Sequence, residues 1–467
     1  MQLESRAYLR TALAAASCGL LGIAPHAMAD APEPLQVDSA LLYYKEQDRV
    51  NVVEATANIK QPLGEGEAVT VTPTVDSITG ASPTGATSTD KAQSFGTDTT
   101  PAGKLPLKHF MDHRYAIGLS WEQPLDRLSK SVLGADASVE RDYNSIGVNG
   151  SLAQDFNNRL TTLSVGLAGS LDTIQPSGGI VPQGLTQLGT SSSAAASTPT
   201  PSSSPVFEDS LTAVIPHAIT TASGLVIGGG SSGSTTSGGS GTTGDIGTPR
   251  QSRSKQVIDG MVGLTQVINR RTLMQLNYSL GISSGYLTDP YKVLSLVDGT
   301  TGDTVGYITE LRPDTRLRQS VYWQTVLHLP EDVIHLSYRY FWDDWGTRSH
   351  TVDLHYHFDL GHDFYLEPQA RYYTQSAADF YHHSLVSGAP LPSYASADYR
   401  LAEMSSYTYG LKLAMPLGKD GEISARATYM QQTGNSHPAD AIGVQRTQDL
   451  YPGLKATTVQ LGLSFKL

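Results

Sequence analysis

The chain contains 467 residues, and charged residues make up 16% of them, well below the roughly 25% typical of soluble globular proteins. The formal net charge of −12 argues against a nucleic-acid binder that relies on overall positive charge. Tyrosine outnumbers phenylalanine, 23 to 9, and there are 45 glycines, a composition that favours a β-rich chain over an apolar helical bundle.

The N-terminal segment has the three parts of a secretory signal peptide. Arg6 and Arg10 supply a basic start, and residues 11–23 form a short apolar stretch. Ala27 and Ala29 then place small residues at the −3 and −1 positions of a cleavage site. We therefore expect export, with removal of this leader by a signal peptidase.

Cleavage at that site divides the chain into a signal peptide, residues 1–29, and a mature chain, residues 30–467. The alternative is a lipoprotein with the lipid on Cys18, but Ala15 stands where a large aliphatic residue is usual. Cys18 is the only cysteine of the chain, so the mature chain has no disulfide, thiolate ligand or cysteine nucleophile. Nothing after the leader offers the ~20 apolar residues that a spanning helix needs.

From Ser39 onward, apolar and polar residues alternate, which is the pattern of strands with one apolar face. In residues 272–283, Met274, Leu276 and Tyr278 share one face, and the residues between them are polar. The same alternation identifies about sixteen candidate strands, at residues 38–46, 49–60, 66–78, 112–123, 134–142, 145–154, 159–171, 257–268, 271–283, 315–329, 332–343, 348–360, 363–375, 402–416, 420–432 and 454–467.

A soluble β-sandwich alternates in the same way, so alternation alone does not decide the fold. These runs reach ~10 residues, the length that a tilted strand needs to cross a bilayer, against ~5–6 for an ordinary strand. Aromatic residues such as Tyr115 and Trp121 recur near the ends of the apolar stripes, as in the belts at membrane interfaces. The pattern predicts an all-β fold, a transmembrane antiparallel β-barrel of about 16 strands, an even number as in bacterial single-chain barrels.

The lengths of the connections support the same fold. With the mature N-terminus in the periplasm, every second connection is short, namely 61–65, 124–133, 155–158, 269–270, 330–331, 361–362 and 417–419. The long insertions all fall on the opposite side, namely 79–111, 172–256, 284–314, 376–401 and 433–453. Short periplasmic turns and long external loops are typical of membrane barrels. The alternation of short and long connections also requires a hairpin between 134–142 and 145–154, because merging these two strands would reverse the direction of every later strand.

The longest of these loops, residues 172–256, has its own composition. It contains dense tracts of Ser, Gly, Thr and Pro, including the run 228–241. With almost no aromatic residues or charge pairs to bury, we expect this external loop to be largely disordered and exposed to solvent.

The C-terminal residues resemble the β-signal by which outer-membrane barrels are handed to their insertion machinery. Gln460, Gly462, Phe465 and Leu467 supply in order a polar residue, a glycine, an aromatic residue and a terminal apolar residue. Terminal Leu467 is a small departure from the commoner Phe. An edge strand of a soluble sheet gives a similar pattern, so that alternative stays open.

Several longer strings together resemble an uncharacterised proteobacterial family, defined as a domain of unknown function and regarded as outer-membrane β-barrels. The likeness covers most of the mature chain, roughly residues 35–467. It implies a fold and a location, and it carries no established activity or catalytic residues. The strings are ITGASPTGA at 78–86, VGLTQVINRRTLMQLNYSL at 262–280, GYLTDPYK at 285–292, SYRYFWDDWG at 337–346 and YLEPQARYYTQSAADFY at 365–381.

One predicted strand, residues 348–360, carries a candidate metal site. Asp353, His355, His357 and Asp359 lie opposite its apolar stripe and so face the lumen. Side chains two residues apart on a strand project in parallel, and a pair of histidines beside carboxylates is able to bind a divalent transition metal. The alternative is that these polar residues simply line a wet lumen.

Further charged residues on the predicted strands face the lumen. Facing rows of opposite charge create a transverse field that sets the selectivity of a pore. The alternative is a salt-bridged polar interior without conduction. The predicted pore-lining residues are Arg114, Arg316, Arg318, Arg339, Glu367, Arg371, Lys412, Glu422 and Arg426, together with Asp353 and Asp359.

Aspartates gather in the external connections of the predicted barrel. Beside a histidine such as His350 they are able to activate water, as in outer-membrane proteases of the aspartate–histidine type, or to bind Ca²⁺. Far more often, aspartates in loops cap turns, and the sequence shows no nucleophile elbow, P-loop or dinucleotide fingerprint. These aspartates are Asp289, Asp314, Asp343, Asp344 and Asp379.

The leading functional hypothesis is therefore a channel for small polar or charged solutes in the outer membrane of a Gram-negative bacterium. The first alternative is a closed barrel that serves as an envelope scaffold or interaction protein, and the second is a hydrolase at the external rim. We expect no enzyme activity and no cofactor. The expected partners are outer-membrane lipid, lipopolysaccharide and the barrel-insertion machinery, without nucleic acid.

Overall fold

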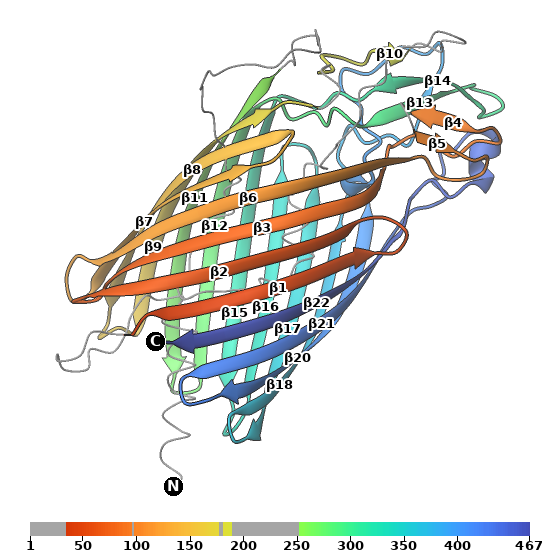
Figure 1. Ribbon diagram of the computed structural model, residues 1–467. Helices are drawn as coiled ribbons and strands as arrows, with labels where there is room; N and C mark the ends of the chain where they lie inside the picture. Colours follow the sequence, from red (N-terminus) through yellow and green to blue (C-terminus); the bar gives the residue numbers. More distant parts are fainter. Residues whose placement is uncertain (1–33, 96–97, 177–180, 189–251) are drawn as a thin grey trace, which may run out of the picture.

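The protein is a closed barrel of antiparallel strands, seen in a computed structural model that describes residues 34–95, 98–176, 181–188 and 252–467. The predicted signal peptide and most of the low-complexity loop lie outside these residues. Each barrel strand pairs with its neighbours in the chain, and β22 returns to pair with β1 (Figure 1). In order, the strands are β1 (Gln36–Glu46), β2 (Asn51–Gly64), β3 (Glu67–Pro83), β6 (Leu107–Pro124), β7 (Ser129–Val139), β8 (Tyr143–Phe156), β9 (Thr161–Ile174), β11 (Arg253–Asn269), β12 (Thr272–Gly285), β15 (Thr315–His328), β16 (Val333–Asp343), β17 (Arg348–Gly361), β18 (Phe364–Gln375), β20 (Met404–Leu417), β21 (Gly421–Gly434) and β22 (Leu454–Lys466).

All sixteen segments expected from alternation are strands of this barrel. The predicted hairpin in the first half is confirmed as β7 and β8, joined at residues 140–142. The largest differences are at β3 and β6, which continue pairing up to Pro83 and Leu107, and at β7, which spans Ser129–Val139 instead of 134–142. The sequence underestimated β3 and β6 because they project beyond the apolar stripe, where alternation no longer marks a strand.

The outside of the barrel is apolar along every strand. On β6, the side chains of Tyr115, Ile117 and Leu119 are 61%, 48% and 50% exposed, whereas Asp112 between the exposed positions is buried. A band of this size would be unstable in water, and lipid is the solvent that it fits. The fold is therefore a transmembrane antiparallel β-barrel. No helix within the described ranges is long and apolar enough to span a membrane.

The two rims of the barrel differ in their connections. One rim carries only short turns, at residues 65–66, 125–128, 157–160, 270–271, 329–332, 362–363 and 418–420. The C-terminus lies at this periplasmic rim, and the long connections gather at the opposite, external rim (Figure 1). The predicted sorting of loops by side is confirmed.

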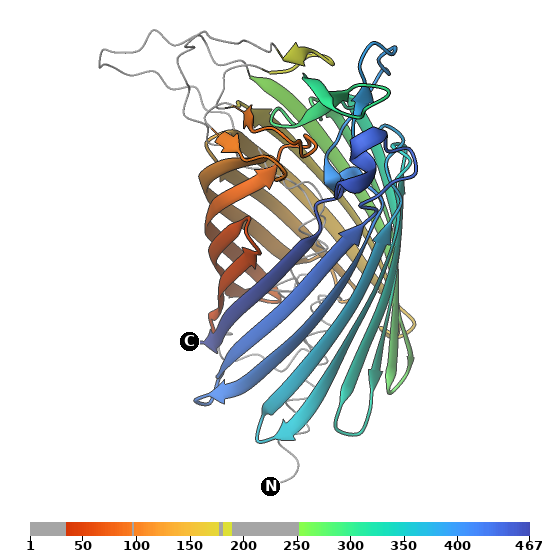
Figure 2. The same ribbon diagram turned by 90° about the vertical axis from the view of Figure 1, so that its right-hand side faces the viewer.

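The long external connections fold together into one structure, which we call the cap. It comprises the described parts of the connections 84–106, 175–252, 286–314, 376–403 and 435–453. Figure 2 shows its segments gathered over one end of the barrel. Three connections combine in one small sheet, and the cap elements are β4 (Gln93–Phe95), β5 (Asp98–Thr100), β10 (Gln187–Leu188), β13 (Val293–Val297), β14 (Thr304–Thr309), β19 (Leu385–Val386), η1 (Tyr399–Leu401) and η2 (Gly443–Thr447).

Two glycines allow two cap connections to interlock. Gly302 and Gly443 both have positive φ, 76° and 50°. A Cβ on Gly443 would lie 1.8 Å from the Thr301 carbonyl oxygen, and a Cβ on Gly302 would lie 2.0 Å from that of Ile442. The adjacent Val444 amide donates to the Thr301 carbonyl at 2.8 Å. Only glycine fits this backbone approach.

We expect Gly443→Ala to separate these two connections, because the added methyl meets backbone rather than a movable side chain. The Val444 amide should then exchange its hydrogen about tenfold faster or more, measured by hydrogen–deuterium exchange. Gly388→Ala is the matched control, since Gly388 also has positive φ, 81°, and a Cβ there meets nothing within 4 Å. Equal exchange in both variants would contradict the role given to the close approach.

Candidate functional site

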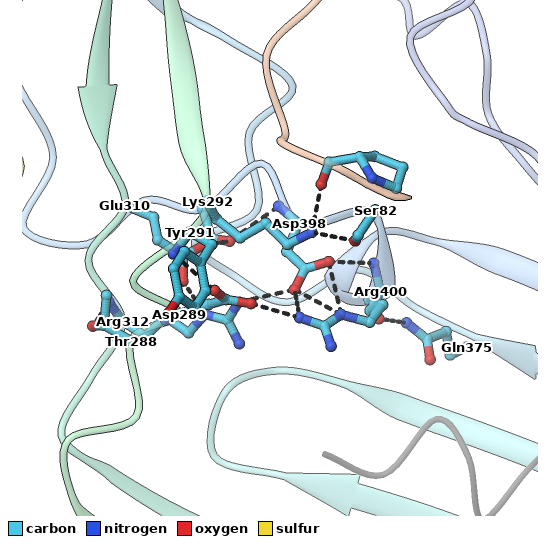
Figure 3. A network of polar contacts seen from close by, with 12 residues as sticks. Ser82, Thr288, Asp289, Tyr291, Lys292, Glu310, Arg312, Gln375, Asp398 and Arg400 are labelled. Carbon is cyan, nitrogen blue, oxygen red and sulfur yellow. Dashed lines mark hydrogen bonds and ion pairs between the residues drawn. The ribbon is translucent and has the colours of Figure 1, made fainter. Parts of the chain in front are cut away.

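A buried network of six charged side chains lies in the cap (Figure 3). Two connections contribute three acids and three bases, so the formal charges of the network cancel. The side chains of Glu310 and Asp398 are 0% exposed, and those of Arg312 and Arg400 are 7% and 13% exposed. Charges are buried at this level only when they are paired. The members are Asp289, Lys292, Glu310, Arg312, Asp398 and Arg400.

Asp398 is the hub of this network. Arg312 Nη2 donates to Asp398 Oδ2 at 2.9 Å, and Arg400 donates to both Asp398 oxygens, through Nε at 3.0 and 2.8 Å. Arg312 Nε also donates to Glu310 Oε1 at 2.6 Å, and Arg400 Nη2 donates to Asp289 Oδ2 at 3.0 Å. Asp398 also caps η1 by accepting from the Arg400 backbone N–H. One carboxylate therefore joins the two connections.

The network is anchored to several sides of the barrel mouth. Lys292 Nζ donates to the Pro83 carbonyl at 2.5 Å and to Ser82 Oγ at 3.2 Å, both at the end of β3. The connection that carries Lys292 leaves from β12, and β6, β7, β8, β9 and β11 separate β12 from β3. Tyr291 donates to Asp142 Oδ2 beyond β7 at 2.6 Å. The cap therefore crosses the mouth instead of standing beside it.

A second set of contacts holds the cap to the closing seam of the barrel. Tyr399 lies between two cations, with Lys292 Nζ 5.8 Å and Arg49 Cζ 5.7 Å from its ring centroid. Arg49 Nη2 donates to the Pro452 carbonyl at 3.1 Å, which ties in the connection before β22. Below these contacts the inner wall is apolar rather than polar, a buried cluster of Leu42, Tyr44, Val50, Val52, Phe110, Met430, Leu454 and Ala456.

Burial and charge shift the pKa values of the network in different directions. Burial alone would raise the pKa of Asp398, but the charges of Arg400, Lys292 and Arg312 outweigh it and hold that pKa well below the ordinary value. Burial raises the pKa of Glu310 against the opposing attraction of Arg312. Burial also lowers the pKa of Lys292, although Asp398 favours its charged form.

These directions predict that mild acid does not open the cap. The lowered pKa of Asp398 gives stability that is present above its unfolded pKa of ~3.9 and lost only as pH falls through the still lower folded pKa. The raised pKa of Glu310 favours the closed form at lower pH, since the folded state binds that proton more readily. We expect hydrogen exchange of the Leu401 amide, corrected for intrinsic rate, to stay within about threefold between pH 7.5 and 5. A large acceleration at pH 5 would contradict the assignment.

The lumen below the cap is lined by paired charges. All nine predicted pore-lining residues lie on the inner face, opposite the exposed apolar stripe. Arg339 is placed with its guanidinium 5.5 Å above the Tyr322 ring. Each of the other six bases pairs with an acid, four of them on the adjacent strand and Arg318 and Arg426 on the strand beyond it, which matches a salt-bridged interior. The pairs are Arg114–Asp76 at 2.5 Å, Arg316–Asp343 at 2.7 Å, Arg318–Asp259 at 3.5 Å, Arg371–Asp353 at 2.5 Å, Lys412–Glu422 at 3.5 Å and Arg426–Glu367 at 2.9 Å.

The charges are nevertheless distributed unevenly around the lumen. The strands β15 to β21 carry acids as well as bases, because the partners Asp343, Asp353, Glu367 and Glu422 lie on them. The opposite strands β2 to β9 carry more acids than bases, with Glu54, Asp76, Asp112, Asp136 and Asp172 among the acids. The lumen therefore has an excess of negative charge on β2 to β9, which faces an arc where acids and bases nearly balance.

The predicted metal set is not assembled, and this expectation needs correction. His355 Nδ1 lies 3.1 Å from Glu367 Oε1, and its Nε2 lies 3.4 Å from Asp353 Oδ1. His357 packs against the Tyr365 ring, and Asp359 accepts from the Gly361 amide in the turn. In the part of the chain that the structure describes, no three His, Cys, Asp or Glu side chains are grouped to hold a metal ion. Neighbouring strands supply hydrogen-bond partners rather than further ligands.

The aspartates of the external rim do not form a site with His350 either. Asp343 accepts from Arg316 and from the Thr347 amide at 2.8 Å, and faces inward. His350 pairs across strands with Tyr340, faces outward, and contacts the Tyr338 hydroxyl at 2.7 Å. The barrel wall therefore separates the two residue types.

The other four rim aspartates also have structural roles. Asp289 belongs to the cap network, Asp314 accepts from the Gly285 amide through its carbonyl, and Asp379 lies against Gly346. Asp344 Oδ1 accepts from the Leu317 amide at 2.9 Å. The arrangement offers turn capping and ion pairing rather than a site for water activation.

Sequence reasoning missed the cap network, although a local signal was present. Residues 293–297 and 304–309 are short runs rich in β-branched residues, and the residues between them include Gly299 and Gly302. This is the pattern of a hairpin, and the structure confirms it as β13 and β14. A hairpin inside a long external insertion indicates a folded connection. No sequence signal places Lys292 against β3.

A family model described as "Protein of unknown function (DUF3570)" matches residues 10–465. No curated protein matches the chain.

Similar solved structures include a "Bacterial polysaccharide outer membrane secretin", at TM-score 0.42 and 8% identity, covering 94% of this chain and 100% of that one. The "CymD monoaromatic hydrocarbon channel" matches at TM-score 0.38 and 8% identity, with 94% and 89% covered. The outer membrane protein opdK from Pseudomonas aeruginosa matches at TM-score 0.38 and 7% identity, with 93% and 98% covered. Likenesses at this level say nothing about activity.

Proposed function

The chain belongs to the DUF3570 family of proteins of unknown function, and we propose that it is an outer-membrane channel for small polar or charged solutes whose external mouth is closed at rest. The fold supports the outer membrane as the location, because a chain that crosses a bilayer only with strands is typical of that membrane. The solute class follows from the charges of the lumen.

The observation that carries this proposal is the charged inner face. A barrel of sixteen strands encloses an aqueous interior unless loops fill it. A purely structural interior needs no excess of acids on one side, as β2 to β9 have opposite the nearly balanced charges of β15 to β21. Such an asymmetric distribution of charge orients a charged or dipolar solute as it passes. The cap restricts the external entrance, so the periplasmic rim, with its short turns, is the freer opening.

The test is single-channel conductance of the refolded, leader-free protein in a planar bilayer, before and after the cap is weakened. We expect few or small openings from the unaltered chain and stable steps from a variant in which the cap network is broken. Absence of conductance from both proteins, each shown to be folded by its heat-modifiable mobility, would refute the channel.

A closed barrel that acts as an envelope scaffold is the second candidate, and the cap is the observation that favours it. Contacts that tie β3, β18 and the closing seam across the mouth suit a plugged barrel as well as a gated one. The same recordings separate the two functions, because a scaffold stays silent after the cap is weakened. A specific partner recovered by crosslinking in intact envelopes would then support the scaffold.

A further inference from the structure

Two lysines at the external rim form a small cationic surface outside the barrel. Lys45 is near the end of β1, and Lys455 is near the beginning of β22, so both lie at the external ends of the two strands that close the barrel. We call Lys45 and Lys455 the rim lysine pair. No other role described above uses either residue.

Both members of the rim lysine pair face the membrane side. Lys45 is exposed and alternates with the buried side chains of Tyr44 and Glu46, on the same face as Tyr43, which is 42% exposed. Lys455 is exposed between two buried residues and shares its face with Val459, which is 42% exposed. The two ammonium groups therefore extend from the lipid-facing stripe and not from the lumen.

The register of the barrel brings the two lysines close together. Lys45 pairs directly with Thr457 across β1 and β22, which makes Lys455 its diagonal neighbour. Diagonal positions are about 7–8 Å apart, within reach for long side chains. The Gln47 amide donates to the Lys455 carbonyl at 2.8 Å and holds this end of the seam together. Two ammonium groups on a rigid backbone are thus able to converge on one anion.

No carboxylate neutralises the rim lysine pair. Neither lysine makes an ion pair with any residue of the described ranges. The outward neighbours on the adjoining strands, Asn51 and Gln431, are uncharged, and Glu46 is buried on the inner side. The chain as a whole carries a net charge of −12, and yet these two cations on its outer surface have no anionic partner within the described ranges. An anion that neutralises them would have to come from another molecule.

The depth of the pair in the membrane identifies that anion. Tyr43 and Tyr429 lie immediately below it on the outward face, at the level where aromatic side chains meet the lipid headgroups. Lysine side chains extend from this level into the headgroup region. Lipid headgroups there present phosphate, which attracts nearby lysine side chains.

We propose that the rim lysine pair binds a phosphate group of an anionic glycolipid, of the diphosphoryl lipid A class, in the outer leaflet. This inference rests on the outer-membrane placement in the proposed function, but not on conduction. Binding there would fix a lipid against the seam where β1 and β22 close the barrel. A free phosphate ion offers the same charge, but it lacks the acyl chains that the apolar stripe below the lysines contacts.

The test is native mass spectrometry of the refolded full protein in zwitterionic detergent, titrated with diphosphoryl lipid A. The double variant Lys45→Gln/Lys455→Gln should bind the first lipid A about thirtyfold more weakly, the loss expected for two surface lysines. The control is Lys91→Gln/Lys104→Gln, which removes the same charge from exposed cap positions away from the lipid. It should bind lipid A as the unaltered chain does.

Equal lipid A binding by the two double variants would overturn the proposal. Competition by inorganic phosphate at the same concentration would also overturn it, because the site would then take a free anion and not a lipid. Lipid A binding is measured independently of conduction. A barrel that binds lipid A but gives no conductance in a bilayer would refute the proposed channel and leave the lipid site standing.

Discussion

Asp398→Asn is expected to open the external mouth of the barrel. The substitution keeps the size of the side chain and removes the charge that joins Arg312 to Arg400. Breaking a buried ion pair by removing one partner costs about 3–5 kcal/mol, because the remaining charges stay buried without compensation. Each 1.4 kcal/mol is a factor of ten, so the closed cap should lose more than about a hundredfold in its equilibrium with open forms.

The measurement is the mean current per inserted protein in a planar bilayer, together with proteolysis of connection 376–403. Asp440→Asn is the matched control, because its side chain is 77% exposed and makes only a distant contact, 3.9 Å, with His383. Control and unaltered protein should behave alike. If Asp398→Asn exposes the connection to protease without adding current, the cap is structural and the scaffold function gains support. If neither readout changes, Asp398 is not the hub of the cap.

The effect should spread beyond the carboxylate itself. Lys292 is buried, and its contacts with Pro83 and Ser82 hold the connection 286–314 against β3. Without the charge of Asp398, two buried arginines and this lysine face only Glu310 and Asp289. Repulsion among the bases then favours movement of the whole connection into water.

Phe465→Ala is expected to give the second large effect, in cells rather than in detergent. Phe465 lies on β22 between Val37 of β1 and Gly421 of β21, in the strand that closes the barrel. If the C-terminal residues are a β-signal, loss of the aromatic ring should reduce outer-membrane insertion about tenfold or more. Refolding of the purified variant into detergent should be little changed, because the ladder of backbone hydrogen bonds is retained.

The measurement is the amount of heat-modifiable barrel in isolated outer membranes, compared with refolding yield in detergent. Phe364→Ala is the matched control, since Phe364 is also an aromatic residue at the periplasmic end of a barrel strand and is 39% exposed. A β-signal predicts loss of insertion for Phe465→Ala alone. Equal losses for both variants would show that the ring contributes only as a membrane anchor.

The barrel could be predicted from the sequence because its strands are long and meet only two solvents. Lipid on the outside and water or paired charges on the inside require apolar and polar residues to alternate along each strand. Leu276 and Tyr278 therefore mark the outward face of their strand even when the neighbouring strands are not known. The parity of the connections then orients the whole chain. The same logic placed Arg371 and Arg426 on the inner face, where the structure confirms them.

The ion-pair partners of those inner residues depend on the register between neighbouring strands. The alternation of apolar and polar residues does not specify that register. Asp353 and His355 share a face, as expected, but their partners Arg371 and Glu367 come from β18. A candidate metal site therefore became a set of ion pairs once β17 and β18 were aligned. Likewise, Asp343 and His350 are close in sequence, but the strands place them on opposite sides of the wall.

The sequence by itself determined the fold class, the number and direction of the strands, and the face on which each strand residue lies, because these depend on local alternation and chain length. Only the tertiary structure decided that the mouth is covered. Lys292 meets Pro83, more than two hundred positions earlier in the chain, and Asp398 meets Arg312. Such contacts depend on which connections the closed barrel brings together at its external rim. The periodic pattern of the sequence does not encode which connections meet there.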